Sequence, residues 1–404
     1  MSLNCVQFSQ ALTVSALLLS SSKVKAAQLL AALAFAWMAQ SGMAAQPAAN
    51  ALPTGGKVVA GAANIAQSGS TMNINQSSQR AVINWTGFDV GAKAAVNFNQ
   101  PNAQAATLNY VNSASKSMIN GAVNANGQVV FVNPNGVVFG KSAEVNVGGM
   151  VATTMNTSSK DFMEGKAIQT YEGENSNGKI VNKGSITGHS VDSYIALMAP
   201  HVKNTGVITA TMGSNNAVAL VAGQKVSLTF AGSQLVSVSV DASVVNALIS
   251  NKLLINAGGG QVIIAANAAQ DLMGGVIKNT GTISANGIST AGGKISLVAN
   301  SVVQNGIVSA NSETANAGQI VISGHQVKLG SNSQTTATGA TSGGQILIGK
   351  TTQNTAQSQI NAKDVSIAEG ALVDASATRN GNGGSVEVWS SHSTTVAGTF
   401  KAKG

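Results

Sequence analysis

The chain has 404 residues, of which 9% are charged, 4% are aromatic and 44% are hydrophobic, and its formal net charge is +8. A disordered chain would be richer in charge and in proline than this one, which has 5 prolines, so the composition indicates a folded protein with small side chains and frequent turns. The basic residues are scattered and few aromatic rings could stack on bases, which argues against nucleic-acid binding.

Residues 1–44 are predicted to be a targeting segment. Lys23 and Lys25 precede an apolar run over residues 26–38, and small residues follow that run, as in a secretory signal peptide. A further apolar stretch over residues 11–19 makes the leader an extended one. An apolar stretch of about a dozen residues is too short to span a bilayer, so a membrane anchor is the weaker interpretation.

We expect the signal peptide to be cut between Ala44 and Ala45, because Gly42 and Ala44 supply the small residues that a signal peptidase requires. The chain has one cysteine, Cys5, which lies in the segment to be removed. The mature chain would therefore have neither a disulfide nor a cysteine-bound metal, and its stability would rest on packing and backbone hydrogen bonds.

The residues after the leader are predicted to form the first strands. Residues 45–80 are small and polar, with β-branched pieces at 57–60 and 72–75, and we place them as a cap over the end of the fold. Trp85 and Phe88 then add bulk to a chain that is poor in aromatic residues. We interpret both as core residues beneath the cap rather than as ligand contacts.

A tight corner follows in the stretch from Gly127 to Met155. Two apolar, β-branched runs flank the tetrapeptide Asn133-Pro134-Asn135-Gly136. Proline presets φ at the first central position of a turn, asparagine tolerates a left-handed conformation at the second, and glycine suits the exit. The stretch is therefore predicted to be a pair of strands that meet at a corner.

The corner belongs to a longer series of motifs over residues 55–155. The series comprises Val82–Trp85, Phe88–Gly91, Val96–Pro101, Leu108–Val111, Ile119–Gly121, Asn133–Gly140 and Ala143–Gly149. It resembles the amino-terminal domain of two-partner-secretion exoproteins, the large bacterial adhesins of the filamentous-haemagglutinin type. Many relatives carry Arg where this chain has Tyr110. A second motif of part of the family, Asn-Pro-Asn-Leu, is absent, which places the chain nearer to the high-molecular-weight adhesins and haem-haemopexin-binding exoproteins.

Two later segments interrupt the small-residue pattern. Residues 160–174 carry a high density of charge and are interpreted as an exposed hairpin or loop that leaves the main body. Residues 237–246 break the rhythm of the following repeats and are interpreted as a second extra hairpin.

From Gly178 the chain repeats itself at intervals of about 20 to 26 residues, which is typical of a β-solenoid. One motif comprises residues 180–186, 202–208, 277–283 and 302–308, and a second comprises residues 194–199, 217–222, 261–266, 294–299, 319–322, 345–348 and 385–388. One rung cannot bury its inner face alone, so neighbouring rungs must stack. The fold class expected is all-β: a parallel β-helix with an amino-terminal cap and extra-helical hairpins, right-handed by the resemblance.

The expected domains are residues 45–300, as the two-partner-secretion domain, and residues 301–404, as further β-helix repeats. No polar terminator follows the final repeats, whereas solenoids need a cap at each end. Either the chain is a piece of a longer rod, or something outside it covers this end.

No catalytic constellation stands out, so no enzyme activity and no cofactor are expected. Gly136 to Ser142 resembles a phosphate-binding loop, but its spacing is one residue too short. The four histidines stand far apart, although stacked rungs could bring His189 and His201 together. Acidic residues do not recur at one place in successive rungs, which argues against a β-helix polysaccharide lyase.

The resemblance implies Sec-dependent export to the periplasm, recognition by the periplasmic modules of an outer-membrane partner transporter, and folding outside the cell. The function expected is that of a secreted or surface-exposed adhesin or haemagglutinin, with a host-cell surface or glycan receptor. Haem or haemopexin binding, or service as the stem of a contact-dependent toxin, are the alternatives.

Overall fold

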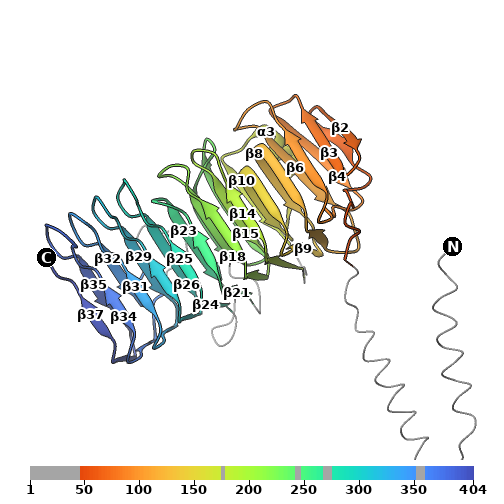
Figure 1. Ribbon diagram of the computed structural model, residues 1–404. Helices are drawn as coiled ribbons and strands as arrows, with labels where there is room; N and C mark the ends of the chain where they lie inside the picture. The colour runs from red at the N-terminus through yellow and green to blue at the C-terminus, as the bar shows by residue number, and fades with distance from the viewer. Residues whose placement is uncertain (1–45, 174–177, 242–246, 267–274, 352–359) are drawn as a thin grey trace, which may run out of the picture. The chain divides into compact units, whose positions relative to one another are not determined.

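In the computed structural model, the described residues are 46–173, 178–241, 247–266, 275–351 and 360–404. Short strands follow one another in successive rungs, and each rung pairs in parallel with the next (Figure 1). The fold is a right-handed parallel β-helix, as expected from the sequence. The described part contains one helix, α3 (Ser159–Glu164). The expected signal segment, including Ala44 and Ala45, lies outside the described residues.

Each rung contributes strands to three faces, which we call the first, second and third face. The first face consists of β5 (Ala95–Asn99), the first halves of β8 (Ala122–Val132) and β10 (Glu144–Thr153), β14 (Ser185–Gly188), β17 (Val207–Ala210), β22 (Leu254–Asn256), β25 (Thr282–Ser284), β28 (Ile307–Ser309), β31 (Gln334–Thr336), β34 (Leu372–Asp374) and β37 (Thr399–Lys401). These strands are short because each ends where the chain turns to the next face.

The second face continues from the first without a loop in β8 and β10, which bend between the two faces. It consists of β4 (Arg80–Trp85), β6 (Ala106–Val111), the second halves of β8 and β10, β15 (Tyr194–Met198), β18 (Ala217–Ala222), β23 (Gln261–Ala266), β26 (Lys294–Ala299), β29 (Gln319–Ser323), β32 (Gln345–Ile348) and β35 (Ser385–Val388). Glycine lies at the bend because the backbones approach closely there: a Cβ on Gly148 would lie 2.7 Å from the carbonyl oxygen of Gly127.

The third face closes each rung. It consists of β7 (Ser117–Ile119), β9 (Gly136–Phe139), β13 (Lys179–Asn182), β16 (His201–Asn204), β21 (Ala247–Asn251), β24 (Gly275–Asn279), β27 (Ser301–Gln304), β30 (Gln326–Leu329), β33 (Asp364–Ile367) and β36 (Ser393–Val396). The first repeat motif of the sequence forms strands of this face together with the adjoining strands of the first face, and the second motif forms the second face.

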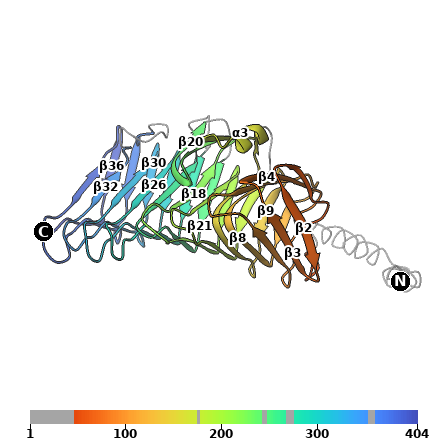
Figure 2. The same ribbon diagram turned by 90° about the horizontal axis from the view of Figure 1, so that it is seen from above.

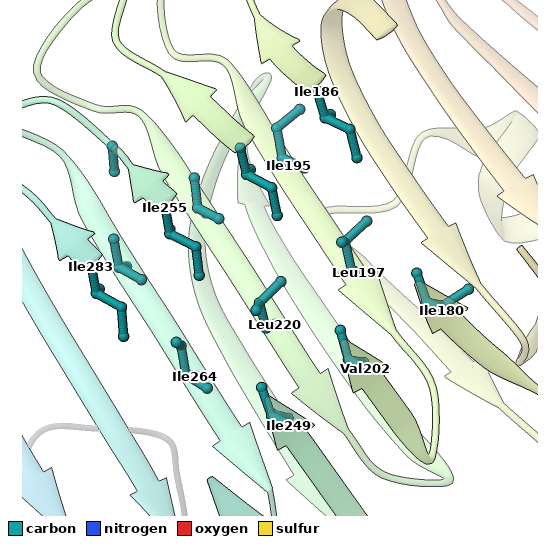
Figure 3. Close-up of a cluster of buried hydrophobic side chains, with 14 of the residues drawn as sticks. Ile180, Ile186, Ile195, Leu197, Val202, Leu220, Ile249, Ile255, Ile264 and Ile283 are labelled. Atoms are coloured by element: carbon teal, nitrogen blue, oxygen red, sulfur yellow. The ribbon is translucent and has the colours of Figure 1, made fainter. Parts of the chain in front are cut away.

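The core is a set of apolar columns, because parallel stacking in register places equivalent side chains above one another. On the first face Ile186, Ile208, Ile255 and Ile283 occupy consecutive rungs, and all four are fully buried. Figure 3 shows three of them, Ile186, Ile255 and Ile283. Full burial of an isoleucine side chain is worth about 1.5–3 kcal/mol. Each rung therefore gains its stability from its neighbours.

A buried amide ladder runs along the third face beside these columns. The side chains of Asn182, Asn204, Asn251, Asn279 and Gln304 occupy equivalent positions in successive rungs, and each is 0–1% exposed. Each asparagine Nδ2 donates to the side-chain oxygen of the next residue, at 2.9, 2.8, 2.8 and 2.7 Å in order along the chain. The ladder satisfies polar groups that would otherwise be costly to bury.

The amino-terminal cap breaks the parallel pattern, as expected for residues 45–80. Strand β1 (Lys57–Ala60) pairs antiparallel with β4, and β2 (Ala63–Ser68) pairs antiparallel with β3 (Thr71–Gln76). Trp85 and Phe88 lie beneath this cap, each 1% exposed, which confirms that they are core residues.

Two excursions leave the β-helix and pair with each other. They form a four-stranded antiparallel sheet, which we call the outer sheet, in the order β11 (Asn156–Thr157), β12 (Ile168–Glu172), β19 (Lys225–Ala231) and β20 (Gln234–Asp241). Figure 2 shows α3 and β20 near each other, on one side of the stack. The outer sheet covers the outer side of the second face through a second apolar cluster that includes Leu108, Val130 and Ala196.

The structure corrects two details of these excursions. Residues 160–173 are not simply an exposed hairpin or loop, because they include part of α3, which Ser158 caps and Gly165 ends with φ of +68°, and because Tyr171 is buried. Glu174, the last residue of the expected loop, lies outside the described residues. The second extra hairpin exists but begins at Lys225, before the expected residues 237–246. Its expected end, residues 242–246, lies outside the described residues.

Candidate functional site

The Asn133-Pro134-Asn135-Gly136 corner joins β8 to β9, that is, the second face to the third. The backbone N–H of Gly136 donates to the carbonyl oxygen of Asn133 at 2.9 Å, which closes the turn. The side-chain oxygen of Asn133 accepts from the backbone N–H of Asn135 at 2.9 Å. This local bond is the Asx turn that asparagine favours at such a position.

The left-handed residue of the corner is Gly136, with φ of +106°, and not Asn135 as the turn chemistry suggested. Among the described residues Asp192 is the one non-glycine residue with a positive φ. The Asx bond holds the backbone of Asn135 in place within the turn, so the unusual conformation falls one residue later, at the glycine.

Hydrogen bonds fix the corner to the preceding rung. The fully buried Asn133 side chain donates to the hydroxyl oxygen of Ser117 at 3.0 Å and to the carbonyl oxygen of Ser115 at 3.1 Å. The amide of Asn135 donates to the carbonyl oxygen of Ser113 at 2.7 Å. No sequence signal identified these three serines, because their role depends on the stacking of rungs that lie some twenty residues apart in the chain.

Close backbone packing fixes the corner to the following rung. A Cβ on Gly136 would lie 2.5 Å from the carbonyl oxygen of Lys179, and a Cβ on Gly178 would lie 2.3 Å from that of Pro134. Real Cβ atoms do not come so close to a backbone atom, so both positions require glycine. The corner is thus held between the rung before it and the rung after it.

The upstream motifs surround the same rungs with an aromatic cluster. The ring centroids of Trp85 and Phe88 lie 5.3 Å apart, those of Phe88 and Phe131 4.9 Å apart, and each pair packs edge to face. The indole Nε1–H of Trp85 donates to the side-chain oxygen of buried Asn109 at 2.9 Å. The motifs upstream of the corner thus form the packed first rungs of the β-helix.

Tyr110 connects these rungs to the outer sheet. Its hydroxyl donates to the carbonyl oxygen of Thr157, next to α3. Burial raises the pKa of Tyr110 above its ordinary value, although hydrogen bonds to Ser159 and Thr157 oppose that rise. The hydroxyl is therefore a neutral donor at physiological pH.

The other candidates of the sequence do not form a site. The phosphate-loop-like stretch is strand β9 followed by a turn, in which the hydroxyl of Ser142 donates to the carbonyl oxygen of Asn120 at 2.7 Å. His189 and His201 do not meet: His189 Nε2 lies 3.0 Å from the carbonyl oxygen of Ala125, and His201 pairs with Lys179 on the third face. Within the described ranges, no three His, Cys, Asp or Glu side chains gather in a way that could hold a metal ion.

The sequence that forms these rungs matches the profile of a known protein family. The profile of the TPS secretion domain matches residues 49–310. The chain belongs to the TPS secretion domain family. Domains of this family direct the export of an exoprotein through a partner transporter in the outer membrane and are not enzymes. Membership thus implies such a transporter as a partner and secretion through the outer membrane as the route.

Solved and curated proteins agree with this assignment. The crystal structure of the HMW1 secretion domain from Haemophilus influenzae matches with a TM-score of 0.74 and 28% identity, over 87% of this chain and 90% of that one. A heme/hemopexin-binding protein of H. influenzae strain Rd is 29% identical over 252 residues, which are 62% of this chain and 27% of that protein. A second H. influenzae protein of the same name is 30% identical over 246 residues, 57% of this chain and 26% of its own length.

The TPS secretion domain described here thus spans about a quarter of the length of the curated relatives that it matches. No helix among the described residues has both the length and the apolar character needed to cross a membrane.

Proposed function

We propose that this chain is the export-directing part of a secreted adhesin, and that the Asn133–Gly136 corner is its secretion motif. The observation that carries the proposal is the double attachment of the corner, to Ser113–Ser117 in the preceding rung and to Lys179 in the following one. A corner held in this way fixes the geometry on which the later rungs stack. Its correct folding outside the cell would favour outward movement of the chain that follows.

The proposed route begins with Sec-dependent export to the periplasm and removal of the signal peptide after Ala44. The periplasmic modules of the partner transporter then recognise residues 45–300 while they are unfolded. The absence of cysteine after residue 5 suits this step, because no disulfide can trap the chain in the periplasm. The folded product is secreted or held at the bacterial cell surface, where it meets a host-cell or glycan receptor.

Haem or haemopexin binding is the second candidate function. The names of the two curated H. influenzae relatives favour it, since both proteins are called heme/hemopexin-binding. In this second proposal, the residues that bind haem or haemopexin lie outside this domain, because the domain corresponds to about a quarter of the length of those relatives.

Co-expression with the partner transporter tests the export function. The chain should appear in the medium when the transporter is present and remain in the cell when it is absent. Equal amounts in the medium with and without the transporter would refute the proposal. The complete exoprotein would then be offered to host cells and to immobilised haemopexin. Retention on haemopexin without binding to cells would favour the second candidate.

A further inference from the structure

A pocket with a cavity volume of about 290 Å³ lies between the outer side of the second face and the outer sheet. Arg80, Gln128 and Tyr194 line it from the second face, and Phe162, Gln169 and Phe230 line it from α3 and the outer sheet. The volume is at the small end of the range for small-molecule sites, so it suits a ligand with a single ring.

The guanidinium group of Arg80 is the cation of this pocket that has no carboxylate partner among the described residues. It lies over the Phe162 ring, 5.3 Å from its centroid. The described residues that line the pocket include no Asp or Glu, and the ion pairs found in the described part of the chain do not involve Arg80. Lys166, the other cationic lining residue, is already paired with Asp161. A guanidinium without a carboxylate partner is suited to bind one from a ligand in a bidentate manner.

Gln169 supplies an acceptor without a partner. The residue is 7% exposed, and its Nε2 donates to the carbonyl oxygens of Lys166 at 2.7 Å and Asp161 at 3.4 Å. These two acceptors fix the orientation of the amide. The Oε1 atom of Gln169 is then left buried with no hydrogen-bond partner, which is costly unless a ligand donates to it.

Aromatic rings supply an apolar wall. The centroids of Tyr194 and Phe230 lie 5.1 Å apart, with an interplanar angle of 61°. The hydroxyl of Tyr194 donates to Gln128 Oε1 at 3.1 Å, which holds the Tyr194 ring in place. Such a wall favours a ligand with an apolar face.

We propose that this pocket binds a carboxylate-bearing monosaccharide, such as a hexuronic acid, alone or at the end of a glycan. The carboxylate would pair with Arg80, a hydroxyl would donate to Gln169 Oε1, and the C–H face of the ring would pack on Phe230. A carboxylate alone has no donor for Gln169, and a neutral sugar leaves Arg80 without a partner, so the pocket selects a ligand that carries both groups. This binding goes beyond export and does not depend on whether the exoprotein is an adhesin.

Titration of the folded chain with glucuronate, followed by saturation-transfer nuclear magnetic resonance, tests the proposal. Glucuronate should bind at least about tenfold more tightly than glucose, which lacks the carboxylate, and than acetate, which lacks the hydroxyls. Arg80→Gln should weaken glucuronate binding about tenfold or more. Arg379→Gln is the matched control, because Arg379 is the other arginine of the chain and lies at an exposed loop far along the stack.

Phe230→Ala tests the apolar wall without touching the charge, with exposed Phe400→Ala as its control. If far-ultraviolet circular dichroism shows that Arg80→Gln does not fold, Phe230→Ala remains as the test of the pocket. Phe230→Ala should lose glucuronate binding, whereas Phe400→Ala should bind glucuronate as the parent chain does. Absence of glucuronate binding to the parent chain, or unchanged binding in the folded pocket variants, would overturn the proposal. Equal binding of acetate would show a site for any carboxylate, including an acidic protein side chain, and would overturn the sugar assignment.

Discussion

The side-chain amide of Asn204 donates to the side-chain oxygen of Asn251 at 2.8 Å, although 47 residues separate the two in the sequence. Asn204 also donates to the carbonyl oxygen of Leu254 at 3.2 Å, and its own oxygen accepts from the backbone N–H of Gly206 at 3.2 Å. One buried side chain thus connects its own turn to the next rung.

Replacing this side chain should therefore destabilise the β-helix. Asn204→Ala should lower the free energy of unfolding by about 1–3 kcal/mol, because it leaves buried polar groups without partners. Urea titration followed by circular dichroism measures the change. Lys203→Ala, on the adjacent, outward-facing position of β16, is the control and should have little effect. Equal effects of the two substitutions would mean that the ladder contributes nothing of its own.

The geometry of the corner predicts different outcomes for two substitutions in the proposed secretion motif. Gly136→Ala should reduce secretion several-fold or more in the presence of the transporter. Alanine is strained at the left-handed φ of this position, and its Cβ would overlap with the carbonyl oxygen of Lys179. Asn135→Val should have a smaller effect, because Asn135 has an ordinary φ and loses mainly its bond to Ser113. Quantitative immunoblotting of the medium measures both.

Gly69→Ala separates strain from overlap in that experiment. Gly69 also has a positive φ, of +57°, but a Cβ there would meet nothing within 4 Å. Secretion of Gly69→Ala should stay close to that of the parent. If Gly136→Ala is also secreted normally, the corner is not a secretion motif in the sense proposed.

Truncation should separate the export domain from the later repeats. A chain that ends at residue 300 should still be secreted and resist protease, because removal of terminal rungs exposes one new end and leaves the remaining stack intact. The amount in the medium and the rate of digestion, relative to the complete chain, are the measurements. Loss of export, or digestion as fast as that of an unfolded chain, would assign the later rungs to the secretion domain.

Alkaline pH should weaken the packing of the outer sheet. Burial raises the pKa values of Tyr110, Tyr171 and Tyr194, the three tyrosines of the chain, above their ordinary value of about 10. The folded chain therefore holds these protons more tightly than the unfolded chain. This contribution to stability is complete below about pH 10 and is lost as the pH rises further.

The urea midpoint should accordingly be steady up to about pH 9 and fall above about pH 10. Tyr171→Phe should make that fall shallower, because it removes one buried hydroxyl that must ionise. A midpoint that falls equally in the parent and in Tyr171→Phe would indicate that Tyr171 does not take part.

The rungs could be predicted from the sequence because their pattern is local. Asn182, Asn204 and Asn279 recur at the same place in a motif, and that recurrence alone places them in register. Both ends of α3 also have local signals in the sequence, although the high charge of this segment favoured a loop. Ser158 accepts from the backbone N–H of Asp161, and Gly165 has a left-handed φ.

The pocket could not be predicted in the same way. Three separate stretches of the chain supply Arg80, Gln169 and Phe230. The pairing of β12 with β19 brings Gln169 and Phe230 together, and Arg80 lines the same pocket from the second face. The position of the positive φ in the corner could not be predicted for a related reason. Turn statistics allow a positive φ at either residue, whereas here the Asx bond within the corner and the stacked rungs on either side together place it at Gly136.

The direction of the amide ladder has a consequence for the order of assembly. From Asn182 to Asn279 each Nδ2 donates to the next rung toward the carboxyl terminus, so each of these rungs has an open donor until the next rung is in place, and Gln304 ends the ladder by donating to the carbonyl oxygen of Gly306. In a chain that folds from its amino-terminal end, each folded rung is thus a template for the next rung. Each completed amide pair makes it energetically costly to unfold the rung that it joins. If the chain folds outside the cell as it emerges, each rung added in this order would hinder the return of the preceding segment through the transporter.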